Sequence, residues 1–462
     1  MKQSISRRQA IKDIAVAGAG IAAGVVLLES FRTPVKSEIP KKEAPEGSRI
    51  VSRTWKQLDG DKVGLLGLGM MRLPKKEGAG NGFTAPLDQE KVNEMVDYAL
   101  AHGINYFDTA PAYGESEKVS GIALSRYPRN SYYLATKCSN MSRGGGAPKY
   151  EDAVKMFETS LANLKTDYID YLLLHNLGSY AQFESRFLKN GVLKYFQQKK
   201  EEGVIRHLGF SYHGDNENFV RILDYPDVKW EFCQIQMNYL DWKKMSVWGG
   251  GDVELSSEFL YNAAAERNIP LTIMEPIRGG ALATVNDGIK SLMNERLPGL
   301  SPAGVALSFV ASYPNVLCTL SGMSNMDQLV ENVETFTDFK PVSEEDRLWL
   351  ATTVCDAYNN NAHIPCTTCS YCMPCPSGVN IPGNFLAFNT TSDELNIPDP
   401  EMKGTKEYKK KRKIFLARYN ALAEGSRADA CTKCNVCLRK CPQSIRIPQQ
   451  LEMIRTLVEK LG

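Results

Sequence analysis

The feature that most constrains the fold of this chain is a long alternation of short apolar runs with amphipathic segments. The apolar runs have the length and composition of buried strands, and the segments between them have helical periodicity. In chain order, the predicted strands are Leu65–Gly69, Ile104–Phe107, Tyr132–Thr136, Ile169–Leu174, Ile205–Gly209, Phe232–Gln236, Leu271–Met274 and Leu317–Ser321. Eight strand–helix units within about 280 residues predict an α/β chain folded as a (β/α)8 TIM barrel.

A doubly wound open sheet is the alternative fold for such an alternation. It needs a glycine-rich phosphate-binding loop after its first strand, and the sequence there, GLGMMRLP, does not supply one. Before the alternation, Trp55–Leu58 and Val63–Leu66 flank the turn pair Asp59-Gly60, which predicts a β-hairpin. The predicted helices include Leu87–His102, Lys149–Asn163, Leu188–Glu202, Ser256–Arg267, Pro302–Ser312, Met326–Val333 and Ser343–Tyr358.

The net charge disfavours one class of function, and the chain length indicates how many domains to expect. The formal net charge is +2, which does not favour a nucleic-acid-binding protein. The basic run Lys403–Lys413 is predicted to be a solvated helix face. With 462 residues, the chain is longer than one ordinary domain, so the region after the barrel is predicted to fold separately.

Three ionisable residues directly follow the second, third and fourth predicted strands. They are Asp108, Lys137 and His175, and Tyr113 lies in the Pro/Gly loop after Asp108. In a TIM barrel the carboxyl ends of all strands open on one face, where the chemistry of these enzymes occurs. Three such residues on successive strands therefore predict an active site at the barrel mouth.

These four side chains can be given physical roles. A phenol has a pKa near 10 and is a weak acid at neutral pH. A neighbouring ammonium stabilises the phenolate, so Lys137 is expected to lower the pKa of Tyr113 and let it donate a proton to a developing alkoxide. Asp108 would hold Lys137 in place, and His175 would orient a substrate carbonyl by a hydrogen bond. The set predicts a site for carbonyl reduction by hydride.

Three motifs, in their order along the chain, resemble those of the aldo/keto reductase superfamily. They are Phe107–Gly114, Ala135–Lys137 and Leu173–His175, and the resemblance extends from about Trp55 to Asn332. It implies a (β/α)8 barrel that oxidises or reduces a small carbonyl or alcohol substrate with NADP or NAD. It also implies a catalytic tetrad of Asp108, Tyr113, Lys137 and His175.

The same resemblance implies where a nicotinamide cofactor binds. Ser211 and Gln234 would hold the carboxamide, Met274 stands where many members stack a tyrosine on the ring, and Gly322, Ser324, Gln328 and Asn332 would hold the adenosine end. Positions that are often Lys or Arg in NADP-preferring members are Gly322, Asn325 and Gln328 here. A 2′-phosphate would lack its usual cationic partners, so both NADP and NAD stay open.

Two tight runs near the carboxyl end hold eight of the 12 cysteines. Cys366, Cys369, Cys372 and Cys375 precede Pro376, and Cys431, Cys434, Cys437 and Cys441 precede Pro442. Three thiolates spaced by two residues can wrap one cubane, while the cysteine before proline reaches a second one. A zinc site would need separated pairs instead. The other cysteines, Cys138, Cys233, Cys318 and Cys355, lie singly in apolar context and are predicted to be core thiols.

The cysteine runs resemble those of bacterial two-cluster ferredoxins. The resemblance implies two 4Fe-4S clusters in a small α-rich ferredoxin-like domain. One cluster would be held by Cys366, Cys369, Cys372 and Cys441, and the other by Cys431, Cys434, Cys437 and Cys375.

The amino end resembles a twin-arginine export signal. Arg7-Arg8 and Lys12 precede a modestly apolar run, Ile14–Leu28, that is short for a membrane span. The resemblance implies an exported, periplasmic protein whose amino end is either cleaved or kept as a membrane anchor; a chance arginine pair before a helix is the alternative. The predicted division is 1–30 signal or anchor, 31–52 linker, 53–342 barrel and 343–462 helical and 4Fe-4S domain.

Two functions follow as hypotheses. The first is an NAD(P)-dependent carbonyl or alcohol oxidoreductase with two clusters that serve electron transfer, with a redox partner protein, or structure. The second is an electron-transfer iron–sulfur protein whose barrel binds a partner or ligand without hydride chemistry. Because a nicotinamide moves two electrons and each cluster moves one, the first hypothesis leaves open what links them.

Overall fold

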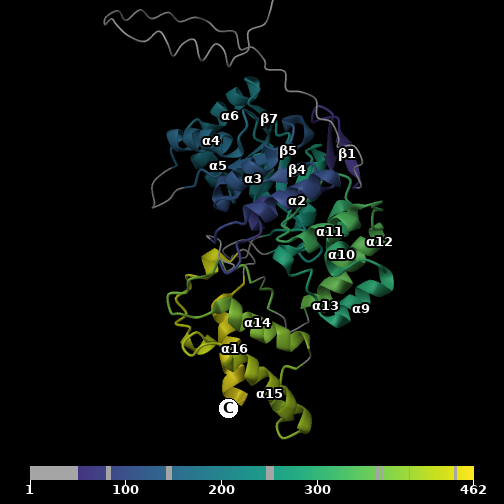
Figure 1. Ribbon diagram of the computed structural model, residues 1–462, viewed down its shortest axis with the longest axis vertical. Coiled ribbons are helices and arrows are strands. Elements are labelled where there is room, and N and C mark those ends of the chain that lie inside the picture. The colour runs from purple at the N-terminus through teal and green to yellow at the C-terminus, as the bar shows by residue number, and fades with distance from the viewer. Residues whose placement is uncertain are drawn as a thin grey trace, which may run out of the picture. The chain divides into compact units, whose positions relative to one another are not determined.

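The computed structural model describes residues 50–79, 85–141, 148–245, 254–359, 364–366, 368–394, 396–441 and 445–461 (Figure 1). The predicted export signal and most of the predicted linker lie outside the described residues. Within the described part of the chain, no helix combines the length and apolar character needed to cross a membrane.

Eight parallel strands close into one barrel, which confirms the predicted (β/α)8 fold. Around the barrel they follow the order β10, β3, β4, β5, β6, β7, β8 and β9. Their bounds are β3 Leu66–Gly69, β4 Tyr106–Asp108, β5 Tyr133–Cys138, β6 Ile169–Leu177, β7 Ile205–Tyr212, β8 Phe232–Gln236, β9 Leu271–Met274 and β10 Val316–Ser321.

Helices cover the outside of the barrel and bury their apolar faces against the strands (Figure 1). Six of these helices lie within a few residues of predicted ones. Among the six, α6 begins at Val192 rather than at Leu188, because Gly191 before it has a φ of 78°. The helices are α2 Gln89–Ala101, α3 Ser116–Leu124, α4 Tyr150–Leu164, α5 Tyr180–Phe183, α6 Val192–Glu201, α7 Asn216–Leu223, α8 Ser257–Glu266, α9 Asp287–Arg296, α10 Pro302–Ala311 and α11 Met326–Phe336.

The strands run further toward the barrel mouth than the apolar runs predict. Asp108 is the last residue of β4, Lys137 of β5 pairs with Leu173 of β6, and β6 continues past His175 to Leu177. Strands on both sides supply backbone hydrogen bonds, so polar residues can stay in the strand conformation. The prediction that the three ionisable residues directly follow the strands is wrong in this detail, although they do lie at the carboxyl ends.

A β-hairpin fills the other end of the barrel. Strands β1 Ser52–Trp55 and β2 Asp61–Gly64 pair antiparallel, so the hairpin is confirmed, with Asp59 and Gly60 at positive φ in its turn. The predicted strand bounds are wrong, because the turn takes in residues 56–60 and both strands lie earlier in the chain. Trp55 and other hairpin side chains pack with buried residues of the barrel interior. The chemistry is therefore left to the opposite, open end.

The helical segment after the barrel packs on the barrel core. It consists of α12 Glu344–Trp349, a π-helical stretch over Leu350–Val354 and α13 Cys355–Asn359. Leu350, Val354 and Tyr358 are buried in the same hydrophobic cluster as the barrel helices. Three of the single cysteines, Cys138, Cys233 and Cys318, are buried as predicted, whereas Cys355 is only half-buried.

The cysteine-rich region has its own hydrophobic core. Helices α14 Ile381–Asp393, α15 Lys406–Asn420 and α16 Ile447–Leu461 pack together (Figure 1). Phe385 and Phe415 are buried between them, and Cys372 and Cys441 belong to the same cluster. The lysines of α15 include exposed residues, while Tyr408 on the same helix is buried, which confirms the solvated basic face.

Candidate active site

Lys137 and Asp108 form a buried ion pair at the carboxyl ends of β5 and β4. The Nζ of Lys137 donates to Oδ1 of Asp108 over 2.5 Å and to the carbonyl oxygen of Thr109 over 2.9 Å. Burial by itself lowers the pKa of Lys137, but the charge of Asp108 and the interactions with Tyr113 outweigh it and leave the pKa raised. Lys137 therefore stays an ammonium inside the barrel mouth.

Tyr113 comes from a 3-10 turn, Pro111–Tyr113, directly after β4. The Nζ of Lys137 lies 4.8 Å from the centroid of its ring. Burial raises the pKa of Tyr113, and the charge of Lys137 and its hydrogen bond to the phenol only partly oppose this. The expected net lowering of this pKa is therefore wrong, because a buried phenolate loses its hydration. At neutral pH Tyr113 carries its proton, which is the state that a proton donor needs.

His175 stands edge-on to Tyr113 with a neutral ring. The two ring centroids are 5.9 Å apart. Burial and the nearby charges of Lys137, His213 and Arg186 lower the pKa of His175 well below its usual range. Its Nδ1 forms a hydrogen bond with Oγ of Ser139. When Ser139 donates this bond, the proton of the imidazole is on Nε2, from which it can be donated to a carbonyl oxygen.

Arg186 fixes the strand ends that carry these groups. Its guanidinium donates to the backbone carbonyl oxygens of Asn140, Asn176 and His175 over 2.8, 2.8 and 2.6 Å. No local pattern in the sequence pointed to Arg186, which lies in the helical stretch Glu184–Leu188 after β6. Ser139 had a signal: side chains two residues apart on a strand share one face, so Lys137 and Ser139 point the same way.

The predicted carboxamide-binding residues are hydrogen-bonded within the barrel. The Oγ of Ser211 accepts from the backbone N–H of Asn176 over 2.8 Å, and Nε2 of Gln234 lies 3.3 Å from Oδ2 of Asp108. Met274 ends β9 and is half-buried. These residues lie on strands at the same mouth as the tetrad, as a ligand spanning that mouth would require.

The predicted adenosine-binding segment lies at the start of α11. The backbone N–H of Ser324 donates to Oε1 of Gln328 over 2.8 Å, and Asn332 is buried and donates to Ser321 over 2.9 Å. A side chain at Gly322 would come within 3.7 Å of Arg72. The aliphatic part of the Arg72 side chain, from another loop, therefore lies beside Gly322.

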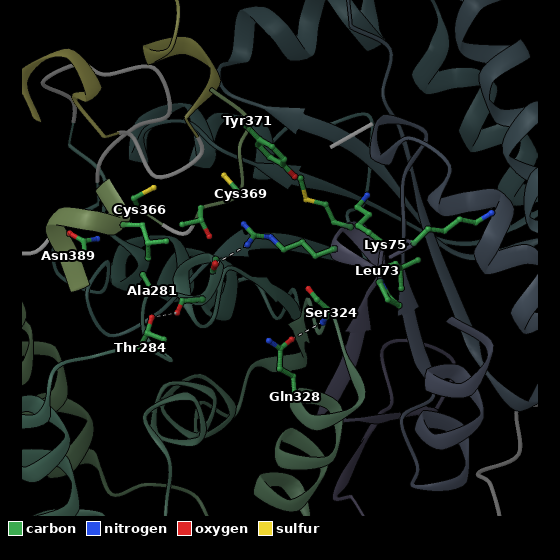
Figure 2. Close-up of a pocket in the computed structure, with 18 of the residues that line it drawn as sticks. Leu73, Lys75, Ala281, Thr284, Ser324, Gln328, Cys366, Cys369, Tyr371 and Asn389 are labelled. Carbon is green, nitrogen blue, oxygen red and sulfur yellow. Dashed lines mark hydrogen bonds between the residues drawn. The ribbon is translucent and has the colours of Figure 1, made fainter. Parts of the chain in front are cut away.

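A pocket of about 1000 Å³ lies between the start of α11 and the loop after β3 (Figure 2). Arg72, Lys75 and Lys76, from the loop after β3, line it together with Ser324 and Gln328. Arg72 is held in place because its Nη1 donates to the carbonyl oxygen of Gly279 over 2.8 Å. Three cations suit a phosphate-bearing ligand, so the residues present fit a dinucleotide.

The eight clustered cysteines fall into two groups. The thiols of Cys366, Cys369, Cys372 and Cys441 interact electrostatically with one another. Cys437 interacts with Cys431, Cys434 and Cys375, and these four line one small cavity, which Cys372 also borders. Within the described residues, no three His, Cys, Asp or Glu side chains are close enough to ligate a single metal ion. Each group offers the four thiols that a 4Fe-4S cluster takes, and a four-iron cubane holds its ligands further apart than one ion does.

Comparison of the sequence with models of protein families identifies the family of the barrel. The model of the aldo/keto reductase family matches residues 65–347. The chain belongs to this family. The model of a 4Fe-4S dicluster domain matches residues 365–446, which include both cysteine runs. The aldo/keto reductase barrel and its oxidoreductase relatives make the protein an oxidoreductase.

Relatives agree with this assignment, and a solved structure shows the same fold. The barrel is 26% identical over 283 residues to the uncharacterized oxidoreductase YqkF of Bacillus subtilis, with 59% of this chain and 90% of the relative covered. It is 27% identical over 297 residues to the L-galactose dehydrogenase of Arabidopsis thaliana, covering 61% of this chain and 86% of the relative. The structure of an aldo-keto reductase from Bacillus halodurans superposes with a TM-score of 0.51 at 24% identity, covering 66% of this chain and 96% of that one.

Proposed function

We propose that the barrel catalyses NAD(P)-dependent interconversion of a small carbonyl compound and its alcohol. The observation that carries this proposal is the constellation of Tyr113, Lys137, Asp108 and His175 at one barrel mouth. It joins a protonated phenol to a buried ammonium and a neutral imidazole. These are the groups that stabilise charge and supply a proton as a carbonyl oxygen becomes an alkoxide.

In carbonyl reduction, each residue acts on the carbonyl oxygen or on its neighbour. His175 donates from Nε2 and orients the carbonyl, and Tyr113 gives its phenolic proton to the oxygen as negative charge develops there. Lys137 stabilises the resulting phenolate, and Asp108 keeps Lys137 in place through the 2.5 Å contact. In alcohol oxidation the proton returns to Tyr113. Burial excludes bulk water, which strengthens these charge interactions.

The residues of the pocket would hold the dinucleotide. Arg72, Lys75 and Lys76 supply charge for phosphates, and Ser324 and Gln328 lie where the adenosine end is expected. The bound nicotinamide supplies or accepts the hydride. Since Arg72, Lys75 and Lys76 line this pocket, a 2′-phosphate bound in it would have cations nearby, and NADP and NAD are both to be tested.

The two cysteine groups would hold one 4Fe-4S cluster each, and such clusters exchange single electrons. Cys434 is exposed, so the second group lies at the surface of the cysteine-rich region, where a redox partner protein could reach it. This supports electron transfer over a purely structural role for the second cluster.

The test of the barrel chemistry is Tyr113→Phe in anaerobically purified protein. The expected result is loss of at least about a hundredfold in kcat with a panel of aldehydes and sugars, including D-arabinose and L-galactose, because the proton donor is gone. Binding of NADPH and the iron content should stay unchanged. Full turnover by Tyr113→Phe would contradict the proposal, and intact iron–sulfur redox behaviour without any turnover by the unaltered protein would favour the electron-transfer alternative.

We also propose that the protein is exported in folded form by the twin-arginine route. Support comes from Arg7-Arg8 and Lys12 before a modest apolar run, and from a cluster-binding region that would be filled before transport. The measurement is fractionation of cells expressing the full chain or the Arg7→Lys, Arg8→Lys double variant. The double variant should accumulate in the cytoplasm, and equal periplasmic amounts of both would contradict export by this route.

A further inference from the structure

One wall of the pocket at the barrel mouth comes from the first cysteine run. Cys366, Cys369 and Tyr371 line it, while Ser324 and Gln328 lie on another side (Figure 2). The barrel residues of the pocket and the loop of the first cysteine group therefore enclose one space. A ligand in that space would contact both.

Tyr371 lines this pocket and lies within electrostatic range of the tetrad. Its phenol interacts electrostatically with Tyr113, Arg72 and Glu275, all of which belong to the barrel. Tyr113 is the proposed proton donor, so the ring of Tyr371 lies near the place where a substrate carbonyl would react. A tyrosine offers such a substrate a flat apolar surface with one polar tip.

The second cysteine run has the same backbone path but presents a different side chain. Thr368 and Ser370 have φ angles of 52° and 63°, and their counterparts Lys433 and Asn435 have 56° and 62°. In both loops the residue after the third cysteine donates its backbone N–H to the residue before the tyrosine or its counterpart, over 3.0 and 3.2 Å.

The counterpart of Tyr371 in the second loop is Val436, since each stands two residues after the second cysteine of its run. Val436 is 42% exposed, whereas Tyr371 lines the pocket. Such a loop thus accepts a valine at this position. The tyrosine is not needed for the backbone path, and its contact with the pocket calls for another explanation.

We propose that Tyr371 forms part of the wall of the substrate site and contacts the apolar or ring face of a carbonyl substrate. Cys369 and Cys372 flank it, so filling the first cysteine group with its cluster holds the ring over the barrel mouth. Tyr371 is a specificity-determining residue that lies outside the barrel. This inference rests on the proposed carbonyl chemistry of Tyr113.

The test replaces Tyr371 by the residue that the second loop carries. Tyr371→Val should raise KM for 4-nitrobenzaldehyde about tenfold with little change in kcat, because the aromatic contact is lost while the proton donor remains. Propanal, which has no ring face, should show a much smaller change. Tyr371→Phe should stay near the unaltered protein, and Val436→Ala is the matched control with no expected effect on either aldehyde.

A binding measurement separates substrate contact from catalysis. The dissociation constant of 4-nitrobenzoate, used as an unreactive probe and measured by calorimetry in the presence of NADP⁺, should rise about as much as KM in Tyr371→Val. Iron and sulfide content of each variant is measured alongside, and should equal that of the unaltered protein. Because Tyr371→Phe keeps the ring, its dissociation constant for 4-nitrobenzoate should stay close to that of the unaltered protein.

The outcomes distinguish this inference from the function on which it rests. If Tyr371→Val leaves both KM and the dissociation constant unchanged while Tyr113→Phe is inactive, the substrate-wall role is overturned and the carbonyl chemistry stands. If Tyr113→Phe is fully active, the proposed chemistry itself fails. If Tyr371→Val raises KM for propanal and for 4-nitrobenzaldehyde by the same factor, the ring of Tyr371 makes no selective contact with the aromatic substrate, and the inference is also overturned.

Discussion

At the scale of single residues, the active site depends on how burial and charge oppose each other. Lys137 keeps its charge because Asp108 is 2.5 Å away, and His175 loses its charge because cations and burial surround it. Tyr113 keeps its proton because burial outweighs Lys137. Each of the three thus has the protonation state that the proposed carbonyl reduction requires, by a different balance of the same two effects.

The hydrogen bond between Ser139 and His175 should matter for catalysis. Ser139→Ala removes the partner of Nδ1, so the neutral imidazole is no longer held in the form that donates from Nε2. A neutral hydrogen bond contributes roughly 0.5–1.5 kcal/mol, so kcat/KM should fall about threefold to tenfold. Steady-state kinetics with a model aldehyde checks this.

Ser131→Ala is the matched control for Ser139→Ala. Ser131 precedes β5, and its Oγ donates to a backbone oxygen of an exposed turn, away from the mouth. The control should keep full activity. A Ser139→Ala enzyme as active as Ser131→Ala would show that the imidazole does not need Ser139.

At the scale of elements, a buried network of charges joins the β1–β2 hairpin to the barrel. Asp61, the first residue of β2, accepts from Tyr171 of β6 and from Arg206 of β7, each over 2.7 Å. His207 of β7 is fully buried, with Nε2 3.3 Å from Asp61 and Nδ1 3.1 Å from Glu231. The hairpin is thus held by charge as well as by apolar packing.

The contribution of His207 to stability should depend on pH. Burial lowers its pKa, but Asp61 and Glu231 outweigh burial and raise the pKa above its ordinary value of 6.5. A raised histidine pKa stabilises the fold below the unfolded pKa, and this stabilisation is lost as the pH rises through the folded pKa.

The variant that tests the histidine is His207→Gln. The difference in free energy of unfolding between the unaltered protein and His207→Gln should be larger near about pH 6 than near about pH 9. Denaturant titrations at both pH values measure it. His102→Gln is the control, because His102 is only half-buried at the end of α2 and its Nδ1 pairs with the carbonyl oxygen of Tyr98 rather than with a carboxylate. An equal difference for His207→Gln at both pH values would mean that the histidine is neutral throughout.

At the scale of the whole molecule, the described residues contain separate hydrophobic cores. The barrel helices and strands share one large cluster, whereas α14, α15 and α16 enclose a smaller one together with Cys372 and Cys441. A small core gains a large share of its stability from bound metal. The barrel and the cysteine-rich region should therefore differ in how they depend on iron.

Loss of the first cluster should unfold the cysteine-rich region before the barrel. Cys372→Ser removes a buried thiol that is proposed to hold this cluster, so limited proteolysis should cut after about residue 364 and leave a resistant fragment that spans the barrel. Mass spectrometry of the fragments identifies the cuts. Cys355→Ser, outside both runs, is the control and should keep the iron content and protease resistance. Equal resistance of both variants would show that this region folds without its cluster.

The sequence predicted the strands of the barrel well because buried parallel strands are short, apolar and evenly spaced. It placed their ends too early, since pairing with two neighbours keeps Asp108, Lys137 and His175 within strands. It did not predict Arg186, because the carbonyl oxygens that it holds come together only when β5 and β6 pair. Such contacts depend on distances across the fold that no local pattern contains.

The sequence by itself determined the barrel, the four polar residues at its mouth and the two cysteine runs, because each depends on local period or spacing. Only the tertiary structure decided the protonation of Tyr113, since the effect of burial is set by the whole surroundings. It alone also placed Arg72 beside Gly322 and Tyr371 in the pocket wall. Those positions depend on long-range packing, which brings together residues that are far apart in the chain.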